Sequence, residues 1–135
     1  MADLTITAAN VRPTDNTTTR RVTAGATVTA GDTLYLKASD GEYYPCDVTT
    51  GAEEAKPAGV ALTNAGDGEE VLLAIDGNII TGGTMTVSEV YVVSASGAVS
   101  PASDLTTGDY ASVVYLSVSA TEAKLVLAES AVVRP

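Results

Sequence analysis

Three acidic turns carry carboxylates of the kind that bind calcium. They are Asp40-Gly41-Glu42, Asp67-Gly68-Glu69-Glu70 and Asp76-Gly77-Asn78. None has the regular ligand spacing of an EF-hand loop. In a β-rich protein such segments end hairpins, because Asp accepts local backbone hydrogen bonds and Gly supplies a positive φ. We therefore interpret all three as turns, and we predict no metal site and no cofactor.

Groups suited to catalysis are scarce. The chain has no histidine, which excludes Ser-His and Cys-His dyads and imidazole metal ligands. The pair Glu53-Glu54 would serve acid–base chemistry only if it were desolvated. The single glycine pair, Gly82-Gly83, lies outside any phosphate-loop motif. A Ser-Lys dyad has no supporting motif around Lys37, Lys56 or Lys124. The sequence predicts that this protein is not an enzyme.

Binding chemistry is more evident near the N-terminus. The stretch 8–24 holds three of the seven basic residues in a chain of net charge −10. Its threonine run has little apolar side chain to bury, and Pro13 restricts the preceding residue to an extended conformation. We predict that residues 1–24 form an extended arm, ordered only against a partner; the alternative is an ordinary mobile terminus. The predicted contact residues are Arg12, Thr17, Thr18, Thr19, Arg20 and Arg21.

Composition favours one domain, residues 25–135, with a thin core. The six aromatic residues are all tyrosines, so Val, Leu, Ile and Ala must fill the interior, which suits two closely facing sheets. The acidic charge, with a pI near 4.1, disfavours nucleic acid and anionic membranes as partners. No apolar run has the length of a signal peptide or a membrane span, so we expect a soluble product made in the cytoplasm. Cys46, the only cysteine, is predicted to be a small buried hydrophobe.

Short segments rich in Val, Thr, Leu and Tyr alternate with Gly, Asp, Asn and Ser along the chain. This pattern predicts an all-β fold of about ten strands and no helix. Residues 33–37 and 42–46 flank Asp40-Gly41, which predicts a hairpin. The other predicted strands lie within 58–63, 70–75, 78–80, 90–94, 98–100, 112–119 and 123–128.

A weak internal repeat divides the domain. The motifs Thr27-Val28, Leu34-Tyr35-Leu36 and Ala38-Ser39-Asp40-Gly41 return as Thr86-Val87, Val90-Tyr91-Val92 and Ala95-Ser96-Gly97. Each copy continues to an Asp (Asp47, Asp104) and a Thr-Thr-Gly (49–51, 106–108). We therefore predict two related β-modules in one barrel or sandwich. Because Ser88-Glu89 replaces Gly31-Asp32 in the second copy, we expect a different turn there.

The order of motifs over roughly 24–128 resembles the head decoration, or capsid cement, proteins of tailed bacteriophages. The resemblance lies in three successive motifs: Ala24–Leu36, which reads AGATVTAGDTLYL, then Gly59-Val60-Ala61-Leu62, then Gly68-Glu69-Glu70-Val71 leading to Asp76-Gly77. It implies a β-barrel or β-tulip-like subunit that forms a homotrimer. It also implies binding of the major capsid protein on the outside of the virion, at threefold and quasi-threefold positions, with the N-terminal arm lying across the shell.

Two other functions remain open at this point. The chain could be a phage head-fibre or adhesin module that binds host-surface glycans, with Tyr43, Tyr44 or Tyr110 as stacking platforms. Adjacent strand residues point to opposite faces, so at most one of Tyr43 and Tyr44 would belong to one platform. It could also be a trimeric β-barrel enzyme of the nucleotide-hydrolase kind, although the acidic and glycine-rich motifs of such an enzyme are not visible.

Overall fold

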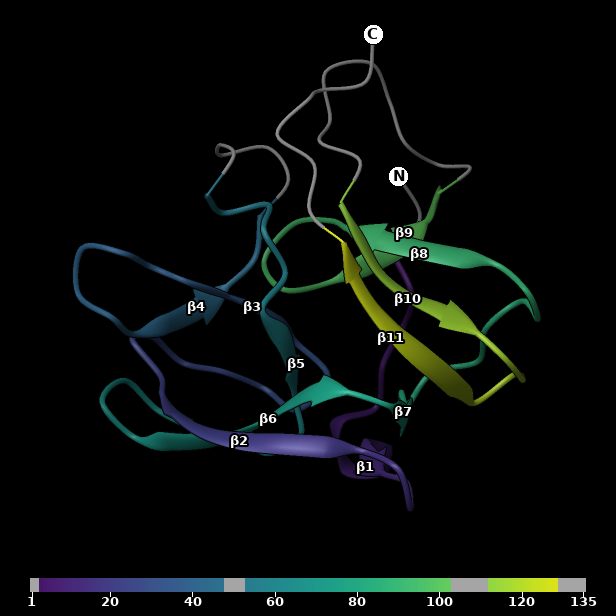
Figure 1. Cartoon of the computed structure of the whole chain (residues 1–135), viewed down its shortest axis with the longest axis horizontal. Helices are drawn as coiled ribbons and strands as arrows, with labels where there is room; N and C mark the ends of the chain where they lie inside the picture. The colour runs from purple at the N-terminus through teal and green to yellow at the C-terminus, as the bar shows by residue number, and fades with distance from the viewer. Residues whose placement is uncertain (1–2, 48–52, 103–111, 129–135) are drawn as a thin grey trace, which may run out of the picture.

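The computed structural model describes residues 3–47, 53–102 and 112–128 (Figure 1). They confirm the all-β prediction. Helical conformation among them is limited to the short 3-10 turn η1 (Ala8–Asn10) and to Ala102, and no helix there is long and apolar enough to cross a membrane. The strands are β1 (Arg12–Pro13), β2 (Thr18–Thr23), β3 (Thr33–Leu36), β4 (Tyr43–Pro45), β5 (Gly59–Ala61), β6 (Glu70–Asp76), β7 (Asn78–Ile80), β8 (Val90–Val93), β9 (Val99–Pro101), β10 (Val113–Ser117) and β11 (Glu122–Ala128).

These strands form two antiparallel sheets that pack as a sandwich. The six-stranded sheet has the order β1-β7-β11-β10-β8-β9, and the five-stranded sheet has the order β2-β6-β5-β3-β4. Figure 1 shows them as the right-hand and left-hand parts of the molecule. Every pairing within the two sheets is antiparallel, and no described strand belongs to both sheets. The sequence predicted a barrel or a sandwich, and the described strands form a sandwich.

The two-module prediction is confirmed by topology. If the strands of each module are numbered along the chain, those of the first module (β2 to β6) lie across their sheet in the order first, fifth, fourth, second, third. Strands β7 to β11 build the other sheet in the same order, with β1 added beside β7. The predicted hairpin is β3–β4, in which Tyr35 lies opposite Tyr44, and β8–β9 is its counterpart. The Thr-Thr-Gly segments and Asp104 lie outside the described residues.

The turn before the second strand of each module is the same, which corrects our expectation of a difference. The amide of Asp32 donates to the carbonyl of Thr29 at 3.0 Å, and the amide of Glu89 donates to the carbonyl of Thr86 at 3.3 Å. The third residue has a positive φ in both turns, 99° at Gly31 and 64° at Ser88. Serine thus adopts the conformation that glycine adopts freely, at a cost in strain.

Replacing Ser88 by glycine is therefore expected to stabilise the fold. The left-handed conformation costs an L-residue about 1–2 kcal/mol, which glycine would avoid. Because glycine has a greater entropy in the unfolded state, part of this gain is lost, and we expect the free energy of unfolding to rise by about 0.5–1 kcal/mol. Urea denaturation measures it. The control Ala95→Gly, at an exposed position without a positive φ, should lose stability instead. A loss for both variants would contradict the strain assigned to Ser88.

The main core lies between the two sheets. It gathers small aliphatic side chains with Tyr35, Tyr91 and Tyr115, as the thin, tyrosine-containing composition predicted. Cys46 is fully buried in it, and this burial raises the pKa of its thiol, which confirms the prediction of a buried hydrophobe. A second, smaller cluster covers the other face of the five-stranded sheet. It consists of Val22, Ala24, Val28, Leu34, Ala61, Ala65, Val71 and Leu73.

Tyr115 offers a direct test of this core. Its side chain is fully buried, and its hydroxyl finds no hydrogen-bond partner among the described residues. A buried unpaired hydroxyl costs about 1–3 kcal/mol, so Tyr115→Phe is expected to raise the free energy of unfolding by about 1 kcal/mol. The control is Tyr91→Phe, which removes the acceptor of the Thr86 amide (3.1 Å) and should lower stability by a similar amount. Calorimetric melts compare them, and destabilisation by Tyr115→Phe would refute the unpaired state.

The predicted N-terminal arm is part of the fold, and the expectation that it orders only against a partner is wrong. Strand β2 pairs with β6 from Thr18↔Asp76 to Thr23↔Glu70, and β1 pairs with β7. The amide of Leu4 donates to the carbonyl of Val99 at 2.7 Å. The physical reason is that backbone hydrogen bonds form a ladder whatever the side chains are, and Val22 adds a buried apolar contact. The boundary between arm and domain at residue 24 therefore falls between adjoining parts of one sheet.

Candidate binding surfaces

Strand β2 is the most exposed strand of the five-stranded sheet. It is one of the two terminal strands of that sheet, and Thr18, Thr19, Arg20 and Arg21 are all exposed. The side chains of Thr19, Arg20 and Arg21 alternate between the two faces, after a shift in register between Thr18 and Thr19. Both faces are thus uncovered over these residues. Edge strands also present backbone donors and acceptors that have no ladder partner, which makes them sites of association. The edge of β2 therefore combines unpaired backbone groups with two cations, Arg20 and Arg21, in a chain of negative net charge.

The two arginines of β2 point to opposite faces, and only one has an ion pair in the described structure. Arg21 Nη1 lies 3.0 Å from Glu70 Oε1, with 74% and 61% of the two side chains exposed. Such an exposed pair contributes at most about 1 kcal/mol to stability. Arg20 shares the face of Val22, whose side chain is buried in the smaller cluster. A partner surface that contacts one face of β2 would therefore meet one of these arginines.

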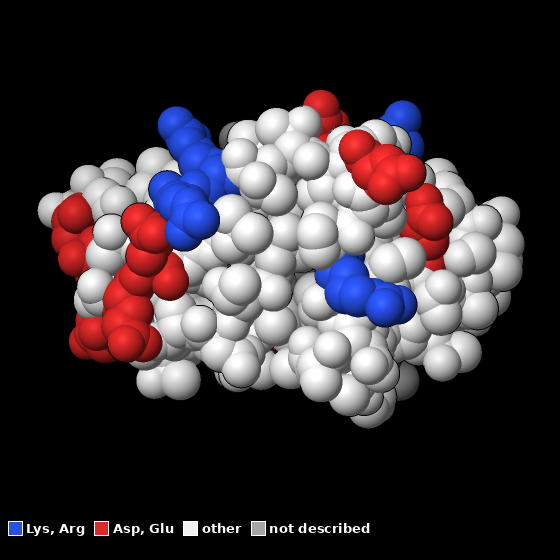
Figure 2. All heavy atoms as spheres, turned by 90° about the horizontal axis from the view of Figure 1, so that it is seen from below, with Lys and Arg blue, Asp and Glu red and all other residues white. Residues whose placement is uncertain are grey.

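The other predicted contact residues are placed differently. Arg12 lies in β1 of the six-stranded sheet, opposite Ile80. Figure 2, which views the side on which β2 lies in Figure 1, shows basic side chains at separate places rather than in one patch. The hydroxyl of Thr17 donates to the carbonyl of Asn78 and accepts from the amide of Thr14, so it serves a turn within the chain. The structure therefore groups Thr18, Thr19, Arg20 and Arg21 in β2 and leaves Arg12 and Thr17 outside that group.

The acidic segments are turns, as predicted. Gly41, Gly68 and Gly77 have φ values of 73°, 83° and 85°. Asp40 Oδ1 accepts from the amide of Glu42 at 2.9 Å, and Asp76 Oδ1 accepts from the amide of Gly77 at 2.9 Å. Within residues 3–47, 53–102 and 112–128 no three carboxylate or thiol side chains are grouped as metal ligands would be. These carboxylates instead stabilise local backbone.

The tyrosines considered as stacking platforms are engaged inside the chain. Tyr44 stacks on Tyr35 with ring centroids 6.0 Å apart, and Lys37 Nζ lies 5.0 Å from its centroid. Its hydroxyl donates to Asp40 Oδ2 at 2.6 Å, which raises the pKa of Tyr44 to about 12 and lowers that of Asp40. Tyr43 packs against the smaller cluster, and Tyr110 lies outside the described residues. Neither described tyrosine is a free platform.

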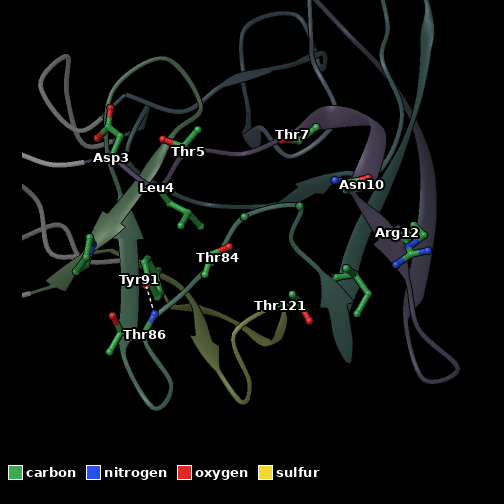
Figure 3. A pocket seen from close by; sticks show the side chains of 14 residues that line it. Asp3, Leu4, Thr5, Thr7, Asn10, Arg12, Thr84, Thr86, Tyr91 and Thr121 are labelled. Carbon is green, nitrogen blue, oxygen red and sulfur yellow. Dashed lines mark hydrogen bonds between the residues drawn. The ribbon is translucent and has the colours of Figure 1, made fainter.

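A polar groove forms where the N-terminal segment crosses the beginning of the second module (Figure 3). Its volume is about 900 Å³. Residues from Asp3 to Arg12 form one wall, and residues from Ile80 to Thr86 form the other, with Tyr91, Pro101 and Thr121 also in the lining. Sequence reasoning missed this groove, since its walls lie far apart in the chain. The one available signal was the glycine pair Gly82-Gly83, on which the N-terminal segment packs.

No protein-family model matches the chain, and no curated protein matches it significantly. The fold and its surfaces define a two-module β-sandwich with an exposed basic edge strand and a polar groove.

Proposed function

We propose that this protein is a structural virion protein that binds the outside of a bacteriophage capsid and stabilises the shell. The observation that carries the proposal is the exposure of β2 on both faces, with Arg20 and Arg21 in a chain of net charge −10. An open strand edge with cations suits a protein partner that offers carboxylates or a strand of its own. This surface lies within the N-terminal stretch whose residue types first indicated binding.

The role needs attachment rather than catalysis. A ligand that binds only the assembled shell stabilises it by mass action, and several linked copies gain avidity through effective concentration. We propose that the copies form a homotrimer seated at threefold and quasi-threefold positions. Partly exposed apolar residues on the outer face of the six-stranded sheet support self-association. Val90 lies opposite Leu116 there, and Val126 is 48% exposed.

Sedimentation with purified capsids tests the proposal. The double variant Arg20→Ala, Arg21→Ala should keep the fold, because both side chains are exposed and the one ion pair is weak. It should weaken capsid binding by about 2 kcal/mol or more if the shell buries either cation against a carboxylate. The control Lys37→Ala, Lys56→Ala removes the same charge outside β2 and should bind normally. Equal occupancy by both double variants would refute a role for β2.

Light scattering tests the assembly independently. A trimer in solution should give a mass of three chains. A protein that remains monomeric at micromolar concentration and on the capsid would contradict the proposed seating, whatever the arginine variants show.

A further inference from the structure

The polar groove is built on a fixed framework. The amide of Thr7 donates to the carbonyl of Gly82 at 2.9 Å, and a Cβ placed on Gly83 would lie 2.8 Å from the carbonyl oxygen of Thr5. Asp3 Oδ1 accepts from the hydroxyl of Ser94 at 2.5 Å, which ties down the start of the segment. Because the two walls are joined by direct backbone contact, the groove exists in the unliganded chain rather than forming around a ligand.

Apart from Asp3 and Arg12, the side chains that line the groove are uncharged, and several of their hydroxyls are available to a ligand. The backbone donors of this region are used inside the chain: the amide of Thr81 donates to Thr121, and the amide of Thr86 donates to the hydroxyl of Tyr91. In the described part of the chain, by contrast, the side-chain hydroxyls of Thr7, Thr84 and Thr121 make no hydrogen bond with protein. Each hydroxyl can both donate to and accept from a ligand.

Apolar surface lies beside these hydroxyls. Leu4 projects toward Tyr91 and Thr84 in Figure 3, while Asn10 and Arg12 approach from the other end. Ile80 and Pro101 add further apolar lining. A lining that offers both hydroxyl and apolar contacts matches a pyranose ring, which carries hydroxyls at its edge and C–H groups on its faces. The chain's net charge of −10 disfavours an anionic ligand, and the groove lining holds one carboxylate, Asp3, and one cation, Arg12, so it carries no net charge of its own.

We propose that this groove binds a neutral saccharide, through the hydroxyls of Thr84 and Thr121, the amide of Asn10 and the apolar side chain of Leu4. Its volume of about 900 Å³ has room for more than one sugar ring. The site is separate from β2 and independent of the proposed capsid binding. It differs from the tyrosine platforms considered above, because its recognition relies on hydroxyl and amide groups rather than on an exposed aromatic ring.

Heteronuclear NMR titration of the full chain with glucose, galactose, mannose and N-acetylglucosamine tests the proposal. At least one sugar should give saturable amide shifts confined to the two groove walls, with a Kd on the order of 1 mM. The double variant Thr84→Val, Thr121→Val keeps side-chain shape and removes two hydroxyls. The affinity for that sugar should fall roughly 10- to 30-fold, since each lost hydrogen bond is worth about 1 kcal/mol.

The matched control is Thr19→Val, Thr23→Val, which makes the same chemical change on β2 and should leave the sugar affinity unchanged. Capsid sedimentation of the groove variant should also be unchanged, so failure of one proposal is distinguishable from failure of the other. The saccharide proposal is overturned if none of the four sugars shifts the groove amides, or if the groove variant binds as the parent does. It is also overturned if a blocked neutral tetrapeptide occupies the groove while the sugars do not.

Discussion

A chain that lacks Met1–Arg21 is expected not to fold cooperatively. The truncation removes β1 and most of β2, and it takes away Leu4, Ile6 and Val11, which pack in or against the main core. Burial of such side chains is worth about 1.5–3 kcal/mol each when complete, so their loss consumes much of a typical net stability of about 5–15 kcal/mol. Strand β6 would also lose most of its pairing with β2, and only β5 would remain as a full partner. Circular dichroism and thermal melting of the truncated chain measure the effect.

The matched variant keeps the strand and removes its polar side chains: Thr18→Ala, Thr19→Ala, Arg20→Ala and Arg21→Ala together. These side chains are exposed, so the variant should melt near the parent temperature. If the truncated chain instead kept the parent's melting transition, the pairing of β2 with β6 would contribute no stability and the segment would behave as a detachable arm.

Replacing Gly77 by alanine is expected to cost about 3 kcal/mol or more. Gly77 joins β6 to β7 with a φ of 85°, and a Cβ there would overlap the carbonyl oxygen of Asn16 in the turn before β2. The left-handed conformation alone costs alanine about 1–2 kcal/mol, and displacement of the turn adds the loss of its hydrogen bonds to Asn78. Denaturant titration gives the free energy of unfolding.

Gly68→Ala is the control, because Gly68 has nearly the same φ, 83°, but nothing within 4 Å of an added Cβ. It should lose only the conformational part, about 1–2 kcal/mol. The difference between the two variants measures how tightly the N-terminal turn docks on the β6–β7 junction. Equal losses would mean that this turn yields freely, which would contradict the docked N-terminal segment.

Local signals predicted much of this fold. The strand and turn pattern indicated an all-β chain, and Asp40-Gly41 indicated the β3–β4 hairpin, because a tight turn and its flanking strands depend on neighbouring residues. The repeat predicted the two modules, whose sheets share one strand order. The reading of the second module's turn was wrong at Ser88, since the surrounding sheet holds a serine in a conformation that residue identity alone disfavours.

The N-terminal segment shows where local reasoning ends. The segment has few apolar residues. When only its own side chains are considered, it is therefore predicted to be a disordered arm. The pairing of Thr19 with Ala74 and Arg20 with Leu73 supplies ladder hydrogen bonds from a strand distant in sequence. Such pairings depend on where the whole sheet lies, and the composition of the segment does not predict that position.

The sequence by itself determined the fold class, the duplication, the turn chemistry of the acidic segments and the burial of Cys46, because these follow from residue types and their local spacing. Only the tertiary structure decided that β2 is an exposed edge, that Arg12 lies in the other sheet from Arg20 and Arg21, and that a groove forms between residues 3–12 and 80–86. Each of these features is made by segments far apart in the chain, which strand pairing and core packing bring together.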